Sequence, residues 1–369
     1  MRVALLTEIP APFRIALWNA LAATNDIDLL VLLLSERDPR RTYDLHRSEW
    51  RFDARVLPGR NALIRRRWIV VSRHVRRELD RFAPDVLVVG GWNQPAFFQA
   101  VRWARGRSPV VLWVESTTRD ERPHSRALEL LKRWLVKRTA FFVVPGRAAA
   151  DYVQAFGVEP RRIAVAPNAI DLTVFSNRVD EERRERTELR RALGLNGCCV
   201  LCVSRLSREK GVDVLVRSFA GVSGELVVIG DGPDRPDAER VAGENVRFLG
   251  RLSRDELHRW YAAADAFALA SRSETWGMAL TEAAAAGLPL VASEAVGAAY
   301  DLVEPGVNGF RVPVGDEQAL HEALLSVVRD EAFRARAGAR SRQLAGRHSP
   351  QRWAEVVAQV VREVAPQSR

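Results

Sequence analysis

Two glutamates, Glu274 and Glu282, are the first candidates for chemistry, and they lie in the stretch SRSETWGMALTEAAAAGLPLVAS at positions 271–293. Glu274 precedes an alanine-rich helix that we expect at residues 278–286, and Glu282 lies inside that helix. A carboxylate accepts two hydrogen bonds from a vicinal diol, and such charge-assisted bonds are about twice as strong as neutral ones. The pair therefore predicts a ligand with two separate sets of hydroxyl groups, such as the ribose of a nucleotide and a sugar beyond its phosphates.

The same loop and helix are suited to binding phosphate. A helix N-terminus carries unpaired N–H groups and a partial positive charge of about half a unit. Gly277 lets the backbone come close to a ligand. Arg205 and Lys210, in the segment RLSREKG after an earlier apolar run, add two full charges. We expect a diphosphate to bind between this helix end and the two cations.

Strand-like apolar runs alternate with helical segments along the whole chain, and this alternation sets where these residues lie. Apolar strands joined by crossover helices form parallel sheets covered on both faces, and ligands gather at the carboxyl ends of the strands. In the second half, four loops should open at that edge: RLSREKG, DGP, RLSRDEL and RSETWG. Two such sets in tandem predict an α/β protein with two doubly wound domains.

The joint between the domains falls near residues 173–178, where a strand gives way to a highly charged helix. A length of 369 residues with 47% apolar composition fits two cores. We assign residues 1–175 to the first domain and 176–348 to the second. Residues 349–369 form a helix with one apolar stripe, which we expect to pack back on the first domain because the second sheet is already complete.

Positive charge is concentrated in the first half of the chain. Residues 1–172 contain 29 Lys and Arg against 18 Asp and Glu, whereas the remainder contains 27 against 28. A basic half can face nucleic acid, an anionic membrane or an acidic substrate, and a solvated arginine-rich surface is an equally good interpretation. Apart from Trp68 and Trp134, the basic clusters lack aromatic residues, and no known nucleic-acid-binding motif is present. We therefore expect no nucleic-acid partner.

The cysteines indicate core packing. Cys198, Cys199 and Cys202 lie in one apolar run, and no matching Cys or His cluster occurs elsewhere, so a zinc site is not expected. The acidic pair at positions 26 and 28 starts a strand and is not expected to bind a metal. No apolar run reaches the ~18 residues of a membrane span, and the N-terminus does not resemble a signal peptide. We expect a cytoplasmic protein.

Several motifs in this order resemble family 4 retaining glycosyltransferases of the GT-B fold: APNAIDLTVF, SRLSREKGVDVLVRSFA, GDGP, FLGRLSRDEL and the glutamate pair, which is similar to that family's E-x7-E signature. The resemblance covers most of residues 165–365. It implies two Rossmann-like doubly wound parallel-sheet domains facing across a cleft, with a nucleotide-sugar donor site between them.

The resemblance also implies roles for individual residues. Arg205 and Lys210 would neutralise the leaving diphosphate. Glu282 would bind the ribose, and Glu274 the hydroxyl groups of the donor sugar. Further donor contacts are implied for Gly277, Met278, Ala279, Gly230, Asp231 and Leu252, with Leu252 beside the base. No metal and no cofactor are implied, since the nucleotide sugar is itself a substrate.

The first half departs from the family pattern. Many members have a glycine-rich loop after the first strand, where this chain reads TEIPAPFR. Many also place a His after the fourth strand, where this chain offers Glu115 and Ser116; His124, nine residues beyond Glu115, is not expected to be equivalent. We expect Glu115 to be the catalytic polar group on the acceptor side. Similar bacterial members with this start make surface polysaccharides or other glycoconjugates.

The predicted reaction moves a sugar from a nucleotide-diphosphate sugar to an acceptor hydroxyl with retention of configuration. The expected partners are the donor, an acceptor glycan, glycolipid or small molecule, and an anionic membrane surface on the inner face of the plasma membrane. Alternatives are a GT-B sugar-nucleotide epimerase, a phosphorylase-like enzyme and a basic non-catalytic nucleic-acid-binding protein. A nicotinamide-dependent oxidoreductase would require G-x-G-x-x-G after the first strand, and TEIPAPFR contains no glycine.

Overall fold

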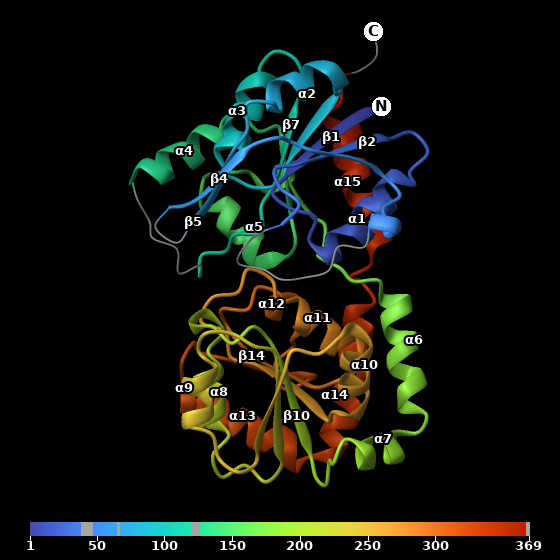
Figure 1. Cartoon of the computed structure of the whole chain (residues 1–369), viewed down its shortest axis with the longest axis vertical. Helices are drawn as coiled ribbons and strands as arrows, with labels where there is room; N and C mark the ends of the chain where they lie inside the picture. Colours follow the sequence, from blue (N-terminus) through green and yellow to red (C-terminus); the bar gives the residue numbers. More distant parts are fainter. Residues whose placement is uncertain (38–46, 65–66, 120–125, 367–369) are drawn as a thin grey trace.

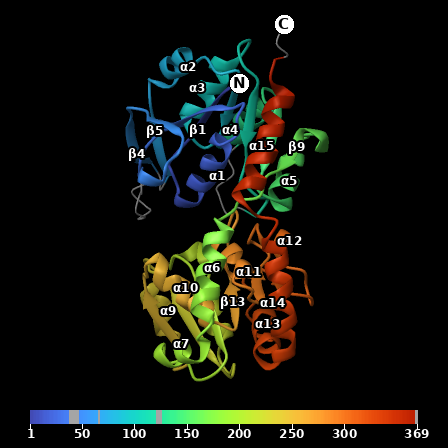
Figure 2. The same cartoon turned by 90° about the vertical axis from the view of Figure 1, so that its right-hand side faces the viewer.

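The apolar runs of the sequence form two parallel sheets, one in each half of the chain (Figure 1). This computed structural model describes residues 1–37, 47–64, 67–119 and 126–366. The two domains lie one above the other, and helices cover both faces of each sheet (Figures 1 and 2). The predicted α/β architecture, with two doubly wound domains facing across a cleft, is confirmed.

The first sheet has seven parallel strands in the order β3-β2-β1-β6-β7-β8-β9. Its strands are β1 Arg2–Thr7, β2 Asp28–Leu33, β3 Asp53–Val56, β6 Val86–Val89, β7 Val110–Trp113, β8 Phe141–Val144 and β9 Ile163–Val165. The accompanying helices are α1 Pro12–Ala22, α2 Val75–Phe82, α3 Pro95–Ala104, α4 Arg126–Val136 and α5 Arg147–Gln154, and an antiparallel hairpin is formed by β4 Arg60–Ile64 and β5 Arg67–Val71. Strand order reverses between β1 and β6, and such a switch point opens a crevice at the carboxyl edge.

The second sheet has six parallel strands in the order β12-β11-β10-β13-β14-β15. They are β10 Cys199–Val203, β11 Glu225–Ile229, β12 Val246–Gly250, β13 Ala266–Leu269, β14 Leu290–Ser293 and β15 Gly309–Val312. The helices of this half are α6 Leu172–Arg183, α7 Arg186–Ala192, α8 Val212–Ser218, α9 Arg235–Arg240, α10 Arg254–Ala263, α11 Met278–Ala285, α12 Ala299–Leu302, α13 Glu317–Arg329 and α14 Glu331–Ala345. The helix expected at residues 278–286 is thus α11, one residue shorter. The switch point lies between β10 and β13.

Each sheet has an apolar cluster on both faces, and the cysteines belong to these clusters. Cys199 packs on one face of the second sheet, whereas Cys202 and the partly buried Cys198 pack on the other. Burial disfavours a charged thiolate and raises the pKa of Cys198 to about 11 and that of Cys202 to about 12. The described part of the chain contains no group of three or more His, Cys, Asp or Glu side chains that could hold a metal ion.

The last helix, α15 Pro350–Val364, returns to the first domain. Ser349 caps its first turn by accepting a hydrogen bond from the Arg352 amide, and Pro350 occupies its first position. The helix lies beside α1 and the first sheet, as Figure 2 shows, and its apolar stripe belongs to the apolar cluster on that face of the sheet. Trp353 is fully buried there, with its ring centroid 5.1 Å from that of Trp113.

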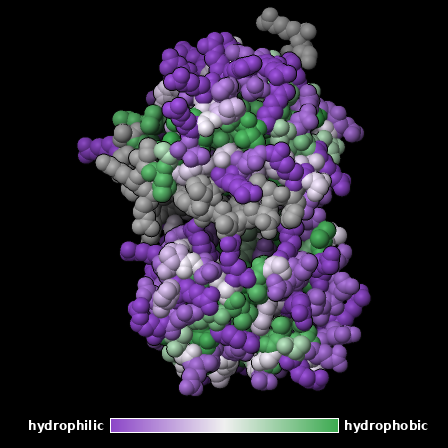
Figure 3. Space-filling model, viewed as in Figure 1, coloured by the Kyte–Doolittle hydropathy of each residue, from purple (hydrophilic) through white to green (hydrophobic). Residues whose placement is uncertain are grey.

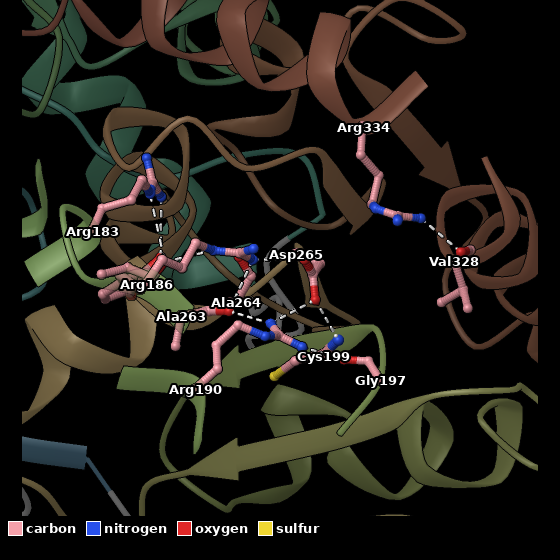
Figure 4. Close-up of polar contacts among 12 residues, drawn as sticks. Arg183, Arg186, Arg190, Gly197, Cys199, Ala263, Ala264, Asp265, Val328 and Arg334 are labelled. Carbon is pink, nitrogen blue, oxygen red and sulfur yellow. Dashed lines mark hydrogen bonds and ion pairs between the residues drawn. The ribbon is translucent and has the colours of Figure 1, made fainter. Parts of the chain in front are cut away.

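The charged segment that opens the second half has a structural role at the end of α10 (Figure 4). Arg186 and Arg190 both donate to Asp265, over 2.6 and 2.9 Å, and Arg190 also donates to the carbonyl of Ala263. Asp265 in turn accepts a hydrogen bond from the Cys199 amide. The last carbonyls of a helix lack partners within that helix. These arginines supply donors for them, which gives Arg186 and Arg190 of the charged segment a structural role.

Candidate active site

A cleft of about 860 Å³ lies between the carboxyl edges of the two sheets. Its walls come from the loops after β1, β6 and β7 on one side and after β10, β11, β12 and β13 on the other. The predicted residues in its lining are Arg205, Lys210, Glu274, Glu115, Gly277, Met278, Ala279, Gly230, Asp231 and Leu252. The cleft therefore gathers predicted residues that are up to 164 positions apart in the sequence, while Glu282 lies outside its lining.

Two glycines let the loops of the second domain pack closely enough to form their wall. Gly277 has a φ of +101°, and a Cβ there would approach Val296 Cγ1 to 2.9 Å. Gly230 has a φ of +131°, and a Cβ there would lie 1.8 Å from the Ser204 carbonyl oxygen. An L side chain at either position would be both strained and obstructed. The result is that the N-terminus of α11, with Met278 and Ala279, faces the cleft.

Both predicted cations are paired with carboxylates of the same wall. Lys210 Nζ donates to Glu274 Oε2, and these two side chains are 17% and 18% exposed. Arg205 pairs with Glu209 and donates through Nε to Ser207 Oγ over 3.2 Å. A phosphate entering here would meet two cations whose carboxylate partners hold them at the wall. The arrangement is suited to exchanging internal ion pairs for charge-assisted bonds to a ligand.

Glu282 lies one helical turn beyond Met278 on α11, and it is half-buried and outside the residues that line the cleft. Its Oε2 accepts a hydrogen bond from the Tyr261 hydroxyl over 2.7 Å. Burial raises the pKa of Glu282 above its usual range, and the hydrogen bond from Tyr261 opposes that effect. Sequence reasoning expected an acceptor that reaches the ligand but did not find Tyr261, whose position on α10 carries no local motif.

Glu115 lies in the cleft, held by two residues that sequence reasoning missed. Arg14 Nη2 donates to Glu115 Oε2 over 3.0 Å, and Asn168 Nδ2 donates to Oε1 over 3.1 Å. Arg14 also donates to Thr7 Oγ1 over 2.8 Å and lies 4.9 Å from the Trp113 ring centroid. The Glu115 carboxylate is therefore one member of a half-buried ion pair rather than an isolated group. Arg14 on the first turn of α1 faces the sheet edge, a placement the sequence could have indicated.

The loops after β1 and β6 add a second polar pair to the first-domain wall. Glu8 directly follows β1 and accepts hydrogen bonds from Asn93 Nδ2 and from Gln94 Nε2, both at Oε1. Trp92 Nε1 donates to Ser116 Oγ over 3.3 Å, which ties the loop after β6 to the loop after β7. The rule applied to the second half, that residues after parallel strands form the site, would also have identified Glu8 and Asn93.

The two chain crossings between the domains touch each other beside the cleft. The His348 ring lies beside the main chain of Asn168, which favours its charged form, and its centroid lies 5.6 Å from that of Trp276. Burial lowers the pKa of His348 to about 4, so the ring is neutral at pH 7. Asn168 and His348 thus connect Glu115 in one wall to the loop before α11 in the other.

Two further polar contacts join the domains. Arg119 Nη1 donates to Glu294 Oε2 over 2.7 Å. Asp301 Oδ2 accepts a hydrogen bond from the Arg147 amide at the start of α5 over 3.1 Å. Burial raises the pKa of Asp301 to about 6, although the bond from Arg147 works in the opposite direction. His124, considered in the sequence, lies outside the described residues.

Comparison with solved structures assigns the fold. The chain superposes on the structure of Anabaena HepE in complex with UDP with a TM-score of 0.79 at 20% identity, over 98% of this chain and 100% of that one. Sucrose-phosphate synthase from Thermosynechococcus elongatus gives a TM-score of 0.75 at 18% identity, over 98% of each chain. The fold, with its cleft between two Rossmann-like domains, is that of the GT-B class.

Two family models cover most of the chain. The model described as Glycosyltransferase Family 4 matches residues 16–174, and the model described as Glycosyl transferases group 1 matches residues 185–344. The chain belongs to glycosyltransferase family 4, as the sequence motifs predicted.

Curated relatives point in the same direction. A D-inositol 3-phosphate glycosyltransferase of Xylanimonas cellulosilytica is 35% identical over 57% of this chain and 52% of its own length. A phosphatidyl-myo-inositol mannosyltransferase of Mycobacterium leprae is 28% identical over 79% of this chain and 76% of its own length. The chain spans only about half the length of several of the relatives that it matches.

Proposed function

We propose that this protein transfers a sugar from a nucleotide-diphosphate sugar to an acceptor hydroxyl, with retention of configuration, during synthesis of a surface polysaccharide or another glycoconjugate. The observation that carries the proposal is the convergence of Arg205, Lys210 and Glu274 at the N-terminus of α11, inside a cleft between two domains. Cations and helix-end amides there suit a diphosphate, and the carboxylate suits the hydroxyl groups of a sugar.

Departure of the diphosphate is the step that the wall of the second domain would assist. Negative charge develops on the leaving phosphate, and pre-positioned cations and amides stabilise such charge where it forms. In the proposed arrangement Arg205, Lys210 and the amides of residues 277–279 contact the diphosphate, while Glu274 holds the donor sugar. Attack from the same face, assisted by the departing phosphate, retains configuration without a protein nucleophile. In this proposal the negative charge of the leaving diphosphate is neutralised by the protein's own cations, Arg205 and Lys210.

The remaining donor contacts follow from the same pose. Leu252, with Gly230 and Asp231 nearby in the lining, would lie beside the base. Glu282 would receive the ribose hydroxyl groups on the carboxylate that Tyr261 orients. On the opposite wall, Glu115 would contact the acceptor or the transferred sugar. The names of the relatives contain inositol phosphate and phosphatidylinositol, and we propose a glycan, glycolipid or small polyol as the acceptor class for this chain.

The test of this function begins with the donor. Because a ligand that binds only the folded state raises the melting temperature, a panel of nucleotide sugars and nucleotides is screened for thermal stabilisation of the full chain. We expect at least one nucleotide diphosphate and its sugar to stabilise the protein. The hit is then incubated with and without acceptors, and products are identified by mass spectrometry and NMR. An isomerised nucleotide sugar without any acceptor would indicate an epimerase, and phosphate-dependent cleavage a phosphorylase.

We further infer that the first domain binds to an anionic membrane surface. Leu130 and Leu131 on α4 are 68% and 46% exposed, and Leu63 on the β4–β5 hairpin is 61% exposed. Figure 3 shows apolar groups of this kind among the polar side chains of the first domain. The surplus of positive charge in residues 1–172 is complementary to anionic lipid. No helix in the described part of the chain is long and apolar enough to cross a bilayer.

Liposome sedimentation tests the membrane inference. We expect the protein to pellet with vesicles that contain anionic lipid and to be released as the salt concentration rises, because salt screens charges at distances beyond about 10 Å. Neutral vesicles provide the control. Equal recovery in the supernatant for both vesicle types would favour a water-soluble acceptor.

A further inference from the structure

Three loops of the first domain, together with the first turn of α1 and the segment after β9, form one polar surface in the cleft. It consists of Glu8, Arg14, Asn93, Glu115 and Asn168, and we call it the acceptor shelf. Bonds from Asn93 to Glu8 and from Trp92 to Ser116 connect the loops after β1, β6 and β7. The shelf is therefore a built structure with fixed polar atoms, rather than a set of independent side chains.

The orientation of Glu8 leaves one carboxylate oxygen for a ligand. Asn93 and Gln94 both donate to its Oε1, and Gln94 is itself fixed because its side-chain oxygen accepts the Val70 amide over 2.9 Å. Gln94 is 1% exposed, so this support lies behind the shelf. Oε2 receives no hydrogen bond from residues 1–37, 47–64, 67–119 or 126–366. A carboxylate oxygen that has no protein donor among these residues, on a residue that lines the cleft, accepts hydrogen bonds from hydroxyl groups and repels phosphate.

The one cation of the shelf is occupied by the protein itself. Arg14 uses Nη1 for Thr7 and Nη2 for Glu115, its Nε is buried, and the side chain is only 12% exposed. To bind a phosphate through this guanidinium, the protein would have to break the pair with Glu115 and leave that carboxylate uncompensated in a half-buried site. Among the five shelf residues, two carboxylates face one arginine, so the net charge of the shelf is negative.

The start of α1 offers little else to an anion. A helix N-terminus usually presents several unpaired amides, but Pro12 has no N–H, and the Arg14 amide donates to the Ala11 carbonyl over 2.8 Å. The proline-rich segment TEIPAPFR thus removes donors at the position where a glycine-rich loop would supply them. The shelf accepts hydrogen bonds and has few donors to give.

We propose that the acceptor shelf selects a reacting group that is an uncharged polyol, such as a terminal sugar of a glycan, and rejects acceptors with a phosphate close to the reacting hydroxyl. Glu8 and Glu115 receive hydroxyl groups of that polyol, and Asn93 and Asn168 position the two carboxylates. This inference rests on the proposed glycosyl transfer and specifies its acceptor class. A lipid diphosphate remote from the reacting sugar is compatible with it, because only the terminal sugar contacts the shelf.

The experiment compares pairs of matched acceptors, and every assay contains the donor identified by thermal stabilisation. Unphosphorylated sugars and polyols are assayed beside their monophosphates, for example glucose and glucose 6-phosphate, or myo-inositol and inositol 3-phosphate. Transfer and acceptor-stimulated release of the nucleotide are measured for the full-length protein. We expect kcat/KM to be at least tenfold higher for the unphosphorylated member of each productive pair. A preference for the phosphorylated members overturns the proposal, and so does nucleotide release that no unphosphorylated compound accelerates.

A substitution that preserves the scaffold assigns the effect to Glu8. In Glu8→Gln, a carbonyl oxygen can still accept from Asn93 and Gln94, while the other oxygen is replaced by an NH₂ donor. For the unphosphorylated acceptor we expect kcat/KM to fall tenfold to hundredfold, mostly because KM rises. The ratio of kcat/KM between the unphosphorylated and the phosphorylated acceptor should also become smaller. Glu129→Gln, on the exposed face of α4, is the matched control and should change neither value. Unchanged acceptor kinetics in Glu8→Gln would overturn the role of this residue.

Donor binding separates this proposal from the proposed function. Thermal stabilisation by the nucleotide diphosphate should be the same in Glu8→Gln and the wild type, because the donor contacts lie on the opposite wall. If no nucleotide sugar binds or is turned over by the wild type, the glycosyltransferase function itself has failed. If donor turnover is normal but phosphorylated acceptors are preferred, only the acceptor class is wrong.

Discussion

The hydroxyl of Tyr261 donates a hydrogen bond to Oε2 of Glu282 over 2.7 Å, and this contact connects α10 to the helix whose N-terminus faces the cleft. Burial raises the pKa of Glu282, and without the hydrogen bond from Tyr261 that pKa would be higher still. Tyr261 is fully buried and packs edge-on against Phe175, with ring centroids 5.4 Å apart. We infer that Tyr261 is a positioning residue that fixes one oxygen of Glu282 and leaves the other for the ribose.

Tyr261→Phe should lower both stability and donor affinity. The substitution keeps the ring but leaves a buried acceptor unsatisfied, which costs about 1–3 kcal/mol. Because the folded-state pKa of Glu282 would rise further, the loss should be larger at high pH, where the carboxyl must ionise. Urea denaturation at pH 6 and pH 8 measures the stability term, and titration with the nucleotide diphosphate measures affinity. A variant with wild-type stability at both pH values would exclude this role.

Lys210→Ala should reduce turnover by roughly a hundredfold to a thousandfold, the range seen when one group that stabilises a developing negative charge is removed. The donor KM should change less, because Arg205 and the amides at the start of α11 remain. Steady-state kinetics with the identified donor provide the measurement. Arg208→Ala is a suitable control, since Arg208 lies in the same short turn but is exposed and outside the cleft lining. Near-normal turnover in Lys210→Ala would show that Lys210 does not stabilise a leaving diphosphate.

The sequence predicted the second domain in more detail than the first because its loops contain residues that packing makes obligatory. Gly230 and Gly277 have positive φ values, and neighbouring atoms occupy the space of a side chain at each position. Because only glycine fits such positions, the loops contain short recognisable motifs. These motifs indicate where the strands end and which residues lie beside the strand ends. Arg205, Lys210 and Glu274 could therefore be placed at one edge from the chain alone, and the structure brings them together.

The first-domain wall could be predicted only in part, because its polar residues are defined by contacts between distant segments. Glu115 could be predicted from the sequence because it follows a buried strand. Its partners Arg14 and Asn168 lie 101 and 53 positions away, and no spacing rule relates them. The pairing of Glu282 with Tyr261 is likewise a tertiary contact between two helices. Sequence periodicity gives the face of a helix but not the residue that meets it.

Asp301→Asn should make the protein less sensitive to pH. Burial raises the pKa of Asp301 to about 6 from 3.8, so the folded state holds this proton more tightly than the unfolded state does. The wild type therefore loses stability relative to the variant as pH rises from about 4 to above 6, by at most about 3 kcal/mol. The amide oxygen can still accept the Arg147 N–H. Melting temperatures of both proteins between pH 5 and pH 8 test this expectation.

A matched control uses a carboxyl with the opposite shift. The hydrogen bonds from Arg340 lower the pKa of Glu304, so its contribution is present at neutral pH and is lost on acidification. Relative to the wild type, the stability of Glu304→Gln should therefore be lowest at neutral pH. Relative to the wild type, the stability of Asp301→Asn should be highest at neutral pH. Parallel pH profiles for the two variants would contradict the assignment of Asp301 as a buried, reluctantly ionised group between the domains.

Trp353→Ala should damage both the first domain and the acceptor shelf. Trp353 is fully buried between α15 and the first sheet, and its ring contacts Trp113, which lines the cleft and supports the Arg14 guanidinium. Removing a buried Trp side chain leaves a cavity and costs about 3–5 kcal/mol. Because Trp113 and Arg14 lose their support, acceptor KM should rise while stabilisation by the nucleotide diphosphate persists. Gln351→Ala, exposed on the same helix, is the control for helix propensity. If Trp353→Ala melts at the same temperature as the wild type, or if it weakens nucleotide binding and acceptor use equally, then α15 does not support the acceptor shelf.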